Sequence, residues 1–438
     1  MRQQIEKWVP AWRALIADMD RQGAHTWPLI IADPAQPWQV DEAEQRLGIS
    51  LPLALRRLFL EGTSEVQIYW SLPTRTVEPF SLGGDIGWSL DSLEWPYFGH
   101  DDESADERQY LCFHVGGNGD MLLLDLRACA DDPPVYAWGH ETDEYILLGH
   151  SFTAFVERVT ELGCIGAEVW NYEPFAGADG LDVHGENAVR WKKWLQTYRE
   201  LTLETAATDF AQLVEYAALH GADDERVRKA FDQYDAKVVQ QAWVTRISQA
   251  PNYPAKEPWC QLLVETLGMK AADWVRSLWE SDGQEKLVSD VQRAYLSAAC
   301  LPKEEGLPLV LAELDNEANS EAMSGYTAYG RLKHFRAREV IAWMEAYAAY
   351  PLEGWDKLFA VSAPEWHDLA HWLAGSEAQR QIALMAWGRM LDKGDVPTGE
   401  PDWTKLDSLL DLAAEKAVLR KERERVERIR AAYGEHAR

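Results

Sequence analysis

The stretch Ala43-Glu44-Gln45-Arg46-Leu47-Gly48-Ile49-Ser50-Leu51-Pro52 decides how the front of this chain is expected to fold. A helical pattern starts at about Asp41 and runs to Leu47, just before Gly48. Pro52 suits the first turn of a second helix, because that turn needs no donor from its backbone nitrogen. The apolar face of this second helix is expected to contain Leu55, Leu58 and Phe59. The stretch therefore predicts two helices separated by a tight turn.

The segments on both sides of this stretch indicate helices and strands in one domain. Before it, apolar residues recur every three or four positions, as in an amphipathic helix: Ile5, Trp8, Trp12, Leu15, Ile16 and Met19. After it, the glycine-rich segment 116–120 predicts a hairpin within a series of four strands, at residues 66–70, 110–115, 121–126 and 135–138. Ser151 is a natural N-cap for a final helix, and Gly163 ends that helix.

This order, helices followed by an antiparallel meander and a closing helix, resembles the SUKH superfamily over about residues 1–165. Four motifs carry the resemblance in sequence order: the stretch 43–52, Gly119-Asp120, Pro134-Val135-Tyr136 with His140, and Ser151-Phe152-x-x-Phe155. The family contains the yeast Smi–Knr cell-wall assembly regulator and many bacterial immunity proteins. The resemblance implies an α+β fold in which an antiparallel sheet packs against helices.

Two segments depart from the family pattern. Where the family often has Asn-Gly after the Leu-Pro helix, this chain has Glu61-Gly62-Thr63. Residues 83–108 are expected to form an enlarged, acidic loop. These departures concern the details of a binding surface more than the fold.

The composition and the apolar pattern of the sequence change near residue 180. Residues 171–185 are rich in breakers and are predicted to be a linker, with Pro174, Gly177, Gly180 and Gly185. We therefore expect a SUKH-like α+β domain at 1–170 and an α-helical domain at 186–438. Prolines divide the second domain into units of about 40–50 residues, which favours an irregular array of helix pairs over the alternative of a compact bundle. Its last stretch, 406–433, is expected to be one long solvated helix.

Composition limits the class of partner. The 438 residues include 72 acidic and 43 basic side chains, for a formal net charge of −29. Nucleic acid is an unexpected partner, because contacts with phosphates need a basic surface. No run approaches the ~18 apolar residues of a membrane span, and residues 1–7 do not resemble a signal peptide. The five cysteines are widely spaced, without a CxxC pair. We expect a cytoplasmic globular protein that contacts no membrane.

Motifs that could carry catalysis are incomplete. His367-Asp368-Leu369-Ala370-His371 places two imidazoles on one helical face, as zincins do, but Asp368 stands where the general base should be Glu, and no third ligand is marked. Gly149-His150-Ser151 begins like a nucleophile elbow, but Thr153 replaces the closing glycine. No P-loop occurs. The sequence therefore predicts no catalytic residue, no metal ligand and no cofactor.

An acidic run after a group of aromatic residues is the candidate binding site. Its carboxylates are Asp101, Asp102, Glu103, Asp106 and Glu107. Such a run is often only a solvated loop, but here Trp88 and Trp95 precede it. Aromatic anchors beside a charged rim are typical of protein interfaces. Residues 1–180, with 30 acidic and 11 basic side chains, have a net charge of −19. These observations predict a site for a basic protein.

The resemblance and the charge together predict a non-catalytic immunity protein. Its partner would be a cognate protein toxin with a basic surface, possibly a nuclease, delivered in competition between bacteria. Complementary charge would speed association with such a toxin. Two alternatives stay open: a SUKH-type scaffold or regulator without a toxin partner, and a metal-dependent hydrolase that uses His367 and His371.

Overall fold

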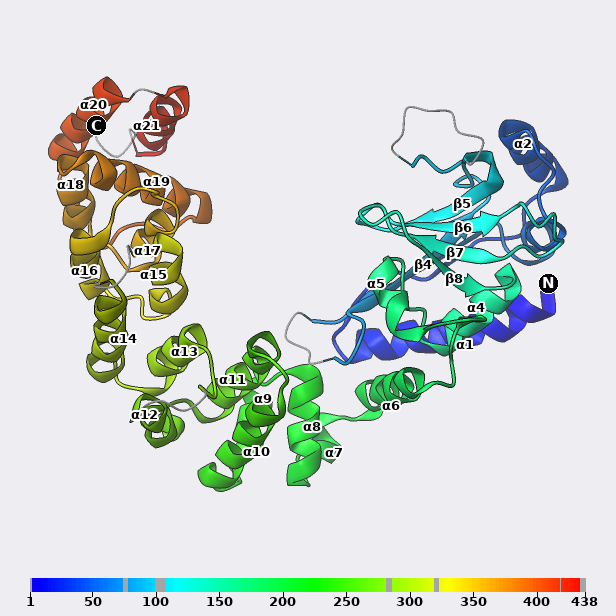
Figure 1. The fold of residues 1–438 in the computed structure, drawn as a ribbon, viewed down its shortest axis with the longest axis horizontal. Coiled ribbons are helices and arrows are strands. Elements are labelled where there is room, and N and C mark those ends of the chain that lie inside the picture. The colour runs from blue at the N-terminus through cyan, green and yellow to red at the C-terminus, as the bar shows by residue number, and fades with distance from the viewer. Residues whose placement is uncertain are drawn as a thin grey trace. The chain divides into compact units, whose positions relative to one another are not determined.

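The structure, a computed structural model, describes residues 2–73, 78–98, 107–280, 286–318, 323–417 and 419–433. The chain divides into two compact units, Met1–Ala230 and Phe231–Arg438. The first combines antiparallel sheets with helices, and the elements described in the second are helices (Figure 1). The predicted fold class, a SUKH-like sheet with packed helices followed by a mainly helical region, is confirmed.

The first sheet of the first unit is built around β3 (Glu65–Ser71). The short strands β1 (His25–Thr26) and β2 (Ile30–Ile31) pair with one edge of β3, and β4 (Gly83–Ser89) pairs with the other along its full length, from Glu65↔Ser89 to Ser71↔Gly83. Strand β4 falls in the segment that the sequence predicts as a loop. That prediction is wrong for residues 83–89, because Ile86 and Trp88 alternate into the core.

The second sheet has the order β5-β6-β7-β8-β10-β9. Its first three strands, β5 (Tyr110–Val115), β6 (Met121–Asp125) and β7 (Val135–Trp138), match the predicted meander. The other three are β8 (Tyr145–Gly149), β9 (Ala176–Gly177) and β10 (Gly180–Leu181). All neighbouring strands are antiparallel.

The predicted linker, residues 171–185, is part of this sheet. Gly180, at a φ of +99°, pairs with Gly149 of β8 and with Gly177 of β9. Tyr172, Phe175 and Leu181 are at most 1 % exposed. The glycines therefore serve a tight β-turn and close strand contacts, and they do not form an exposed joint. The structure corrects the linker, whereas the outer domain limits 1–170 and 186–438 stay a prediction.

The helices of the first unit follow the predicted caps. Ser151 Oγ accepts a hydrogen bond from Ala154 N at 3.0 Å and starts α4 (Phe152–Glu161). Gly48, at a φ of +72°, ends α2 (Pro37–Leu47), and Pro52 caps α3 (Leu53–Arg57), which continues as a π-helical turn, η1 (Leu58–Gly62). The remaining helices are α1 (Arg2–Arg21), η2 (Glu107–Gln109), α5 (Val169–Tyr172), η3 (Glu173–Phe175), α6 (Glu186–Glu200), α7 (Leu203–Ala206), α8 (Phe210–His220) and α9 (Glu225–Phe231).

Residues 43–52 connect these helices to the first sheet. Arg46 donates hydrogen bonds to the carbonyl oxygens of Leu93 (2.6 Å) and Leu90 (3.1 Å). Glu44 accepts from Leu51 N at 2.9 Å and from Arg56 at 2.5 Å. These four bonds hold the turn between α2 and α3 and the segment that follows β4. Glu44 and Arg46 of this stretch therefore stabilise the fold.

Aromatic rings link the helices and strands of the first unit into one core. Trp12 of α1 packs edge-to-face on Trp88 of β4, with ring centroids 5.9 Å apart, and Trp88 packs on Phe152 of α4 at 5.4 Å. Phe152 in turn contacts Phe113 of β5 at 5.5 Å. Four elements that lie far apart in the sequence therefore share one aromatic cluster.

The second unit consists of helices, several begun by capping boxes at Ser289, Glu365 and Ser376. Its elements are α10 (Ala236–Gln249), α11 (Tyr253–Leu267), η4 (Gly268–Ala271), α12 (Ala272–Glu280), α13 (Asp290–Cys300), α14 (Lys303–Ala318), α15 (Gly325–Leu332), α16 (Glu339–Tyr347), α17 (Trp355–Val361), α18 (Trp366–Ala374), α19 (Glu377–Lys393), α20 (Trp403–Lys416) and α21 (Arg420–Tyr433). The predicted single helix over 406–433 is wrong, because α20 ends at Lys416 and α21 begins at Arg420. Among the helices described, none is long and apolar enough to cross a membrane.

A half-buried histidine is expected to make the first unit sensitive to acid. The ring of His220, at the end of α8, lies between Tyr198 and Tyr216, with both centroid distances 4.5 Å. Burial lowers the pKa of His220 from 6.5 to about 4, although a hydrogen bond with the backbone of Gln22 opposes this shift. Between these two pH values the unfolded imidazole binds a proton that the folded one does not.

We therefore expect the free energy of unfolding to fall as the pH decreases from 6.5 to 4, by up to about 3 kcal/mol from His220. The contribution of His220 is fully present above pH 6.5 and is gone below pH 4, where both states are protonated. Denaturant unfolding at several pH values measures the slope. The variant His220→Phe keeps an aromatic ring and should flatten the profile in this window, so an unchanged profile would contradict the assignment.

Candidate functional site

The acidic run that the sequence predicts as a binding site falls largely outside the described residues. This applies to Asp101, Asp102, Glu103 and Asp106. For Glu107 only the backbone is described, at the start of η2. The role of these carboxylates therefore stays a prediction.

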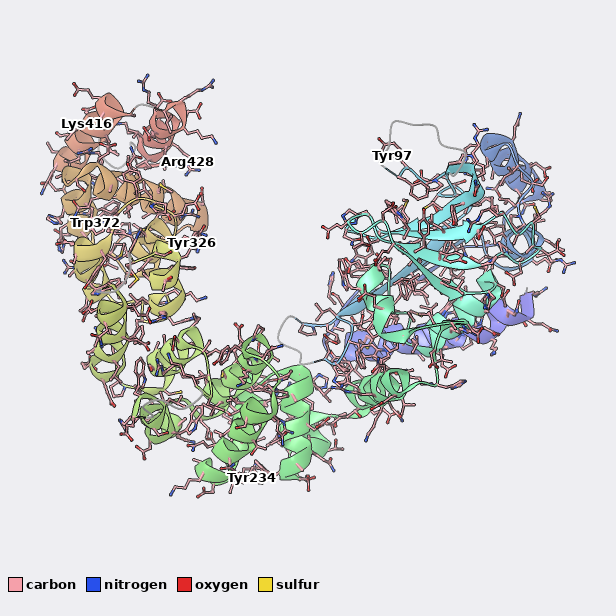
Figure 2. The ribbon with its side chains drawn as sticks, viewed as in Figure 1. Tyr97, Tyr234, Tyr326, Trp372, Lys416 and Arg428 are labelled. Carbon is pink, nitrogen blue, oxygen red and sulfur yellow. The ribbon has the colours of Figure 1, made fainter. Side chains whose placement is uncertain are left out.

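The two predicted aromatic anchors differ in their surroundings. Trp88 is 3 % exposed in the core, so it cannot be a surface anchor, and this part of the prediction is wrong. Trp95 is half-buried, and its indole N–H donates to the carbonyl oxygen of Leu47 at 3.2 Å. Nearby, Tyr97 is 69 % exposed (Figure 2). Trp95 stays a predicted anchor, and Tyr97 is the exposed ring of this segment.

The histidine pair of α18 does not converge on one point. His367 lies with its ring nitrogens 3.0 Å from Glu365 and 3.3 Å from Asp368, whereas His371 faces Glu345 at 3.2 Å. Both histidine side chains are more than half exposed. Asp368, at the position of the zincin general base, accepts hydrogen bonds from Glu365 N and from Arg338. The geometry is that of a helix cap with ion pairs.

In the described part of the chain, Asp290, Glu313 and Glu317 are the one group of at least three carboxylate, imidazole or thiol side chains close enough to share a metal ion. Arginines already neutralise this group: Arg293 lies 2.9 Å from Asp290, and Arg331 lies 2.8 Å from Glu317. Burying carboxylates together with guanidinium groups is typical of a structural ion network. It pins α13, α14 and α15 together.

The first unit contains a different site, which we name the acidic cleft. It is a cavity of about 500 Å³ between the end of the β3–β4 ladder, the β5–β6 turn and the start of α5. Among the described residues, its lining contains three carboxylates and no lysine, arginine or histidine. The carboxylates are Glu78, Asp85 and Glu168. The aromatic lining residues are Tyr69, Trp70, Phe80 and Trp170.

Two of the three carboxylates of the acidic cleft, Glu78 and Glu168, are ionised at an energetic cost. Burial raises the pKa of Glu168, and the charges of Asp120 and Asp85 raise it further. Burial also raises the pKa of Glu78, although backbone hydrogen bonds and the charge of Arg190 oppose the shift. Asp85 faces the imidazole of His114 at 3.3 Å. Mutual repulsion in a partly buried site is relieved when a cation enters it.

Exposed apolar side chains surround the cleft. Trp170 is 51 % exposed and Leu82 is 60 % exposed. Trp27, 43 % exposed, stacks on Tyr69 with ring centroids 4.2 Å apart. Large aromatic side chains that stay accessible beside buried charge are a feature of binding surfaces.

Asp120, from one of the sequence motifs, and Gly84, from β4, shape the cleft. Asp120, 2 % exposed, accepts hydrogen bonds from His140 N (3.0 Å), His140 Nδ1 (2.8 Å) and Val169 N (2.8 Å). The last bond fixes the start of α5, between Glu168 and Trp170. On β4, a Cβ atom at Gly84 would lie 2.1 Å from the carbonyl oxygen of Cys164, so only glycine allows this close approach.

The acidic cleft was not predicted from the sequence. Glu168 and Trp170 stand just before the stretch taken as a linker, and Asp85 lies in the segment taken as a loop. A signal was present in Gly83-Gly84-Asp85-Ile86-Gly87-Trp88, where two apolar residues alternate as in a strand and glycines mark close backbone approach.

Comparison with known families agrees with this geometry. Residues 34–158 match the SMI1 / KNR4 family (SUKH-1). This chain carries a SUKH domain. The matched residues run from before α2 to α4 and include Asp120 and His140, so the predicted resemblance is confirmed. The family includes immunity proteins. No curated protein and no solved structure matches the chain.

The SUKH match ends before part of the cleft. Asp85 lies within residues 34–158, but Glu168 and Trp170 follow them. The hydrogen bond from Val169 N to Asp120 connects the two parts. The acidic cleft is therefore formed jointly by the matched residues 34–158 and by the α5 segment that follows them.

Proposed function

We propose that this protein is a non-catalytic immunity protein of the cytoplasm, and that its acidic cleft binds a basic side chain of a cognate protein toxin. The observation that supports this most is the lining of the cleft. Among the described residues it contains three partly buried carboxylates and no lysine, arginine or histidine, with exposed aromatic rings at its edge. Membership of the SUKH domain in a family with immunity proteins agrees with this function.

The chemistry of the cleft selects a lysine or an arginine. Ion-paired hydrogen bonds to Glu168 and Asp85 would be stronger than neutral ones. They would offset the burial, and the smaller repulsion from Asp120 and Asp85, that raise the pKa of Glu168. The face of Trp170 can receive the cation. Nuclease toxins carry such basic groups to hold phosphates, so occupation of the cleft would also block their substrate.

The acidic run 101–107 would contribute in a different way. Exposed charges act at long range and mainly accelerate association, whereas buried contacts determine how slowly the complex dissociates. We therefore propose that the acidic run accelerates association with the toxin and that the acidic cleft determines how slowly the complex dissociates. The run consists of Asp101, Asp102, Glu103, Asp106 and Glu107, and Trp95 is a predicted anchor beside it.

The test is a binding measurement with the toxin encoded beside the gene of this protein. The variant Glu168→Lys should weaken binding at least about thirtyfold, because breaking a partly buried charge pair costs about 2–5 kcal/mol. It should also abolish protection of cells that express the toxin. The matched control is Glu173→Lys, an exposed glutamate five residues further that does not line the cleft.

The same experiment separates the two acidic regions. Replacing Asp101, Asp102, Asp106 and Glu107 by Lys should slow association at low salt and leave dissociation nearly unchanged. If Glu168→Lys and Glu173→Lys bind the toxin equally well, the cleft is not the binding site. If no toxin gene is adjacent and the cleft-dependent partner is another cellular protein, the chain is a SUKH-type scaffold or regulator.

A further inference from the structure

The second unit contains a basic pocket, although the whole chain is strongly acidic. The pocket has a volume of about 650 Å³ and lies among α15, α17, α19 and the loops that follow them. Packing of α17 against both α15 and α19 brings these helices side by side (Figure 1). Four cationic side chains line the pocket, against two carboxylates, Asp392 and Asp395. The cations are Arg336, Lys357, Arg389 and Lys393.

Two of these cations have no ionic partner in the described part of the chain. Neither Arg336 nor Lys393 has a carboxylate oxygen within ion-pair distance there, and both are exposed. Lys357 lies 4.9 Å from the ring centroid of Tyr326, and Arg389 bonds the buried Asp356. Of the two lining carboxylates, Asp392 is already paired with Arg428 at 3.0 Å. The lining thus keeps an excess of positive charge.

The backbone around this pocket is strained at two positions. Arg336 has a φ of +47° and Ala363 has a φ of +52°, in the left-handed region that side chains other than glycine rarely adopt. Glycine would be the low-energy residue at both. Strain of this kind persists where the surrounding structure enforces it, and it is found at binding sites. At Arg336 the strained position presents a guanidinium group to the pocket.

We propose that the basic pocket binds a small organic molecule that carries phosphate groups. Arginine and lysine are the residues that bind phosphate, through charge-assisted hydrogen bonds. The volume suits a small ligand, and Tyr329, Val361 and Met390 supply apolar surface for its organic part. Because the cations gather in one concavity, a compact anion fits better than an extended acidic peptide. This proposal does not depend on the toxin-binding function.

The test is calorimetric titration of the full chain with ATP and with inorganic pyrophosphate, in the presence of EDTA and at low salt. Wild-type protein should bind both, and adenosine should not bind. Arg336→Gln and Lys393→Gln should each weaken ATP binding about tenfold, because each removes one charge-assisted contact. The matched control, Lys416→Gln, changes an exposed lysine of α20 that does not line the pocket (Figure 2).

A further variant separates binding from folding. Arg336→Gly removes the guanidinium group but suits a positive φ, so it should also weaken ATP binding about tenfold without lowering the thermal unfolding midpoint. The proposal is overturned if neither ATP nor pyrophosphate binds, or if Arg336→Gln and Lys393→Gln bind ATP like wild type. It is also overturned if a poly-glutamate peptide binds through these residues more tightly than ATP.

Discussion

Replacing Trp88 by alanine should destabilise the first unit by about 3–5 kcal/mol. The indole is 3 % exposed and contacts Trp12 and Phe152 edge-to-face, so the change would open a cavity at the centre of the aromatic cluster. Helices α1 and α4 both pack on this ring. Differential scanning calorimetry of the full chain should show the transition of this unit lowered by about 10 °C.

Two control variants define the role of Trp88. Its indole N–H has no hydrogen-bond partner among the described residues, so Trp88→Phe should cost much less than Trp88→Ala. Tyr97→Ala should leave stability almost unchanged, because that ring is 69 % exposed. If Trp88→Ala keeps the wild-type transition and weakens only toxin binding, Trp88 is a surface anchor and the core assignment is wrong.

Trp88 lies in β4, a strand that could not be predicted from the sequence. The caps and faces of α1, α2 and α4 were predictable, because each depends on residues three or four positions apart. Strand β4 was not, because its three glycines have low strand propensity and its neighbours resemble loop residues. What makes residues 83–89 a strand is pairing with β3, a contact that local patterns do not contain.

The acidic cleft was unpredictable for a related reason. Asp120 and His140 were recognised as motif residues, but their direct hydrogen bond is a property of the folded sheet. Glu168 and Asp85 lie 83 residues apart in the sequence but line the same cavity, where Gly84 allows β4 to approach Cys164 closely. A search for short motifs cannot find a site whose carboxylates are brought together by tertiary structure.

In the second unit, the sequence predicted that the elements are helices but not the residues at which they begin and end. Helical periodicity was clear throughout, but the break between α20 and α21 carries no glycine or proline. At this break, Arg423 donates two hydrogen bonds to the carbonyl oxygen of Ala417, at 3.2 and 3.1 Å, and so caps the end of α20. Packing of Leu406, Leu410 and Ile429 in one core accounts for the two separate helices.

Asp120→Ala should destabilise the SUKH domain by about 3 kcal/mol. Three donors, His140 N, His140 Nδ1 and Val169 N, would lose a buried carboxylate that accepts from all of them. Burial opposes ionisation of Asp120, but the hydrogen bonds that it accepts outweigh burial and lower its pKa. The ionised form is therefore the one that holds the hairpin, the β7–β8 turn and α5 together.

Asp120→Asn is the sharper variant, because it keeps the shape of the side chain. An amide can accept on one side only, so either the His140 donors or Val169 N would face its NH₂ group. We expect a loss of about 1–2 kcal/mol, small enough for the protein to stay folded. Loosening Val169 would displace Glu168 and Trp170, so binding of the toxin should weaken about tenfold.

Asp125→Asn is the matched control for this effect. Asp125, at the end of β6, is also a buried carboxylate with a lowered pKa. Its partner is Arg127, at 2.7 Å, and neither residue lines the acidic cleft. Both variants should lower stability, and only Asp120→Asn should weaken toxin binding. Equal binding by the two variants would mean that Asp120 supports the fold without positioning the cleft, whereas the effect of Glu168→Lys would still decide whether the cleft binds the toxin.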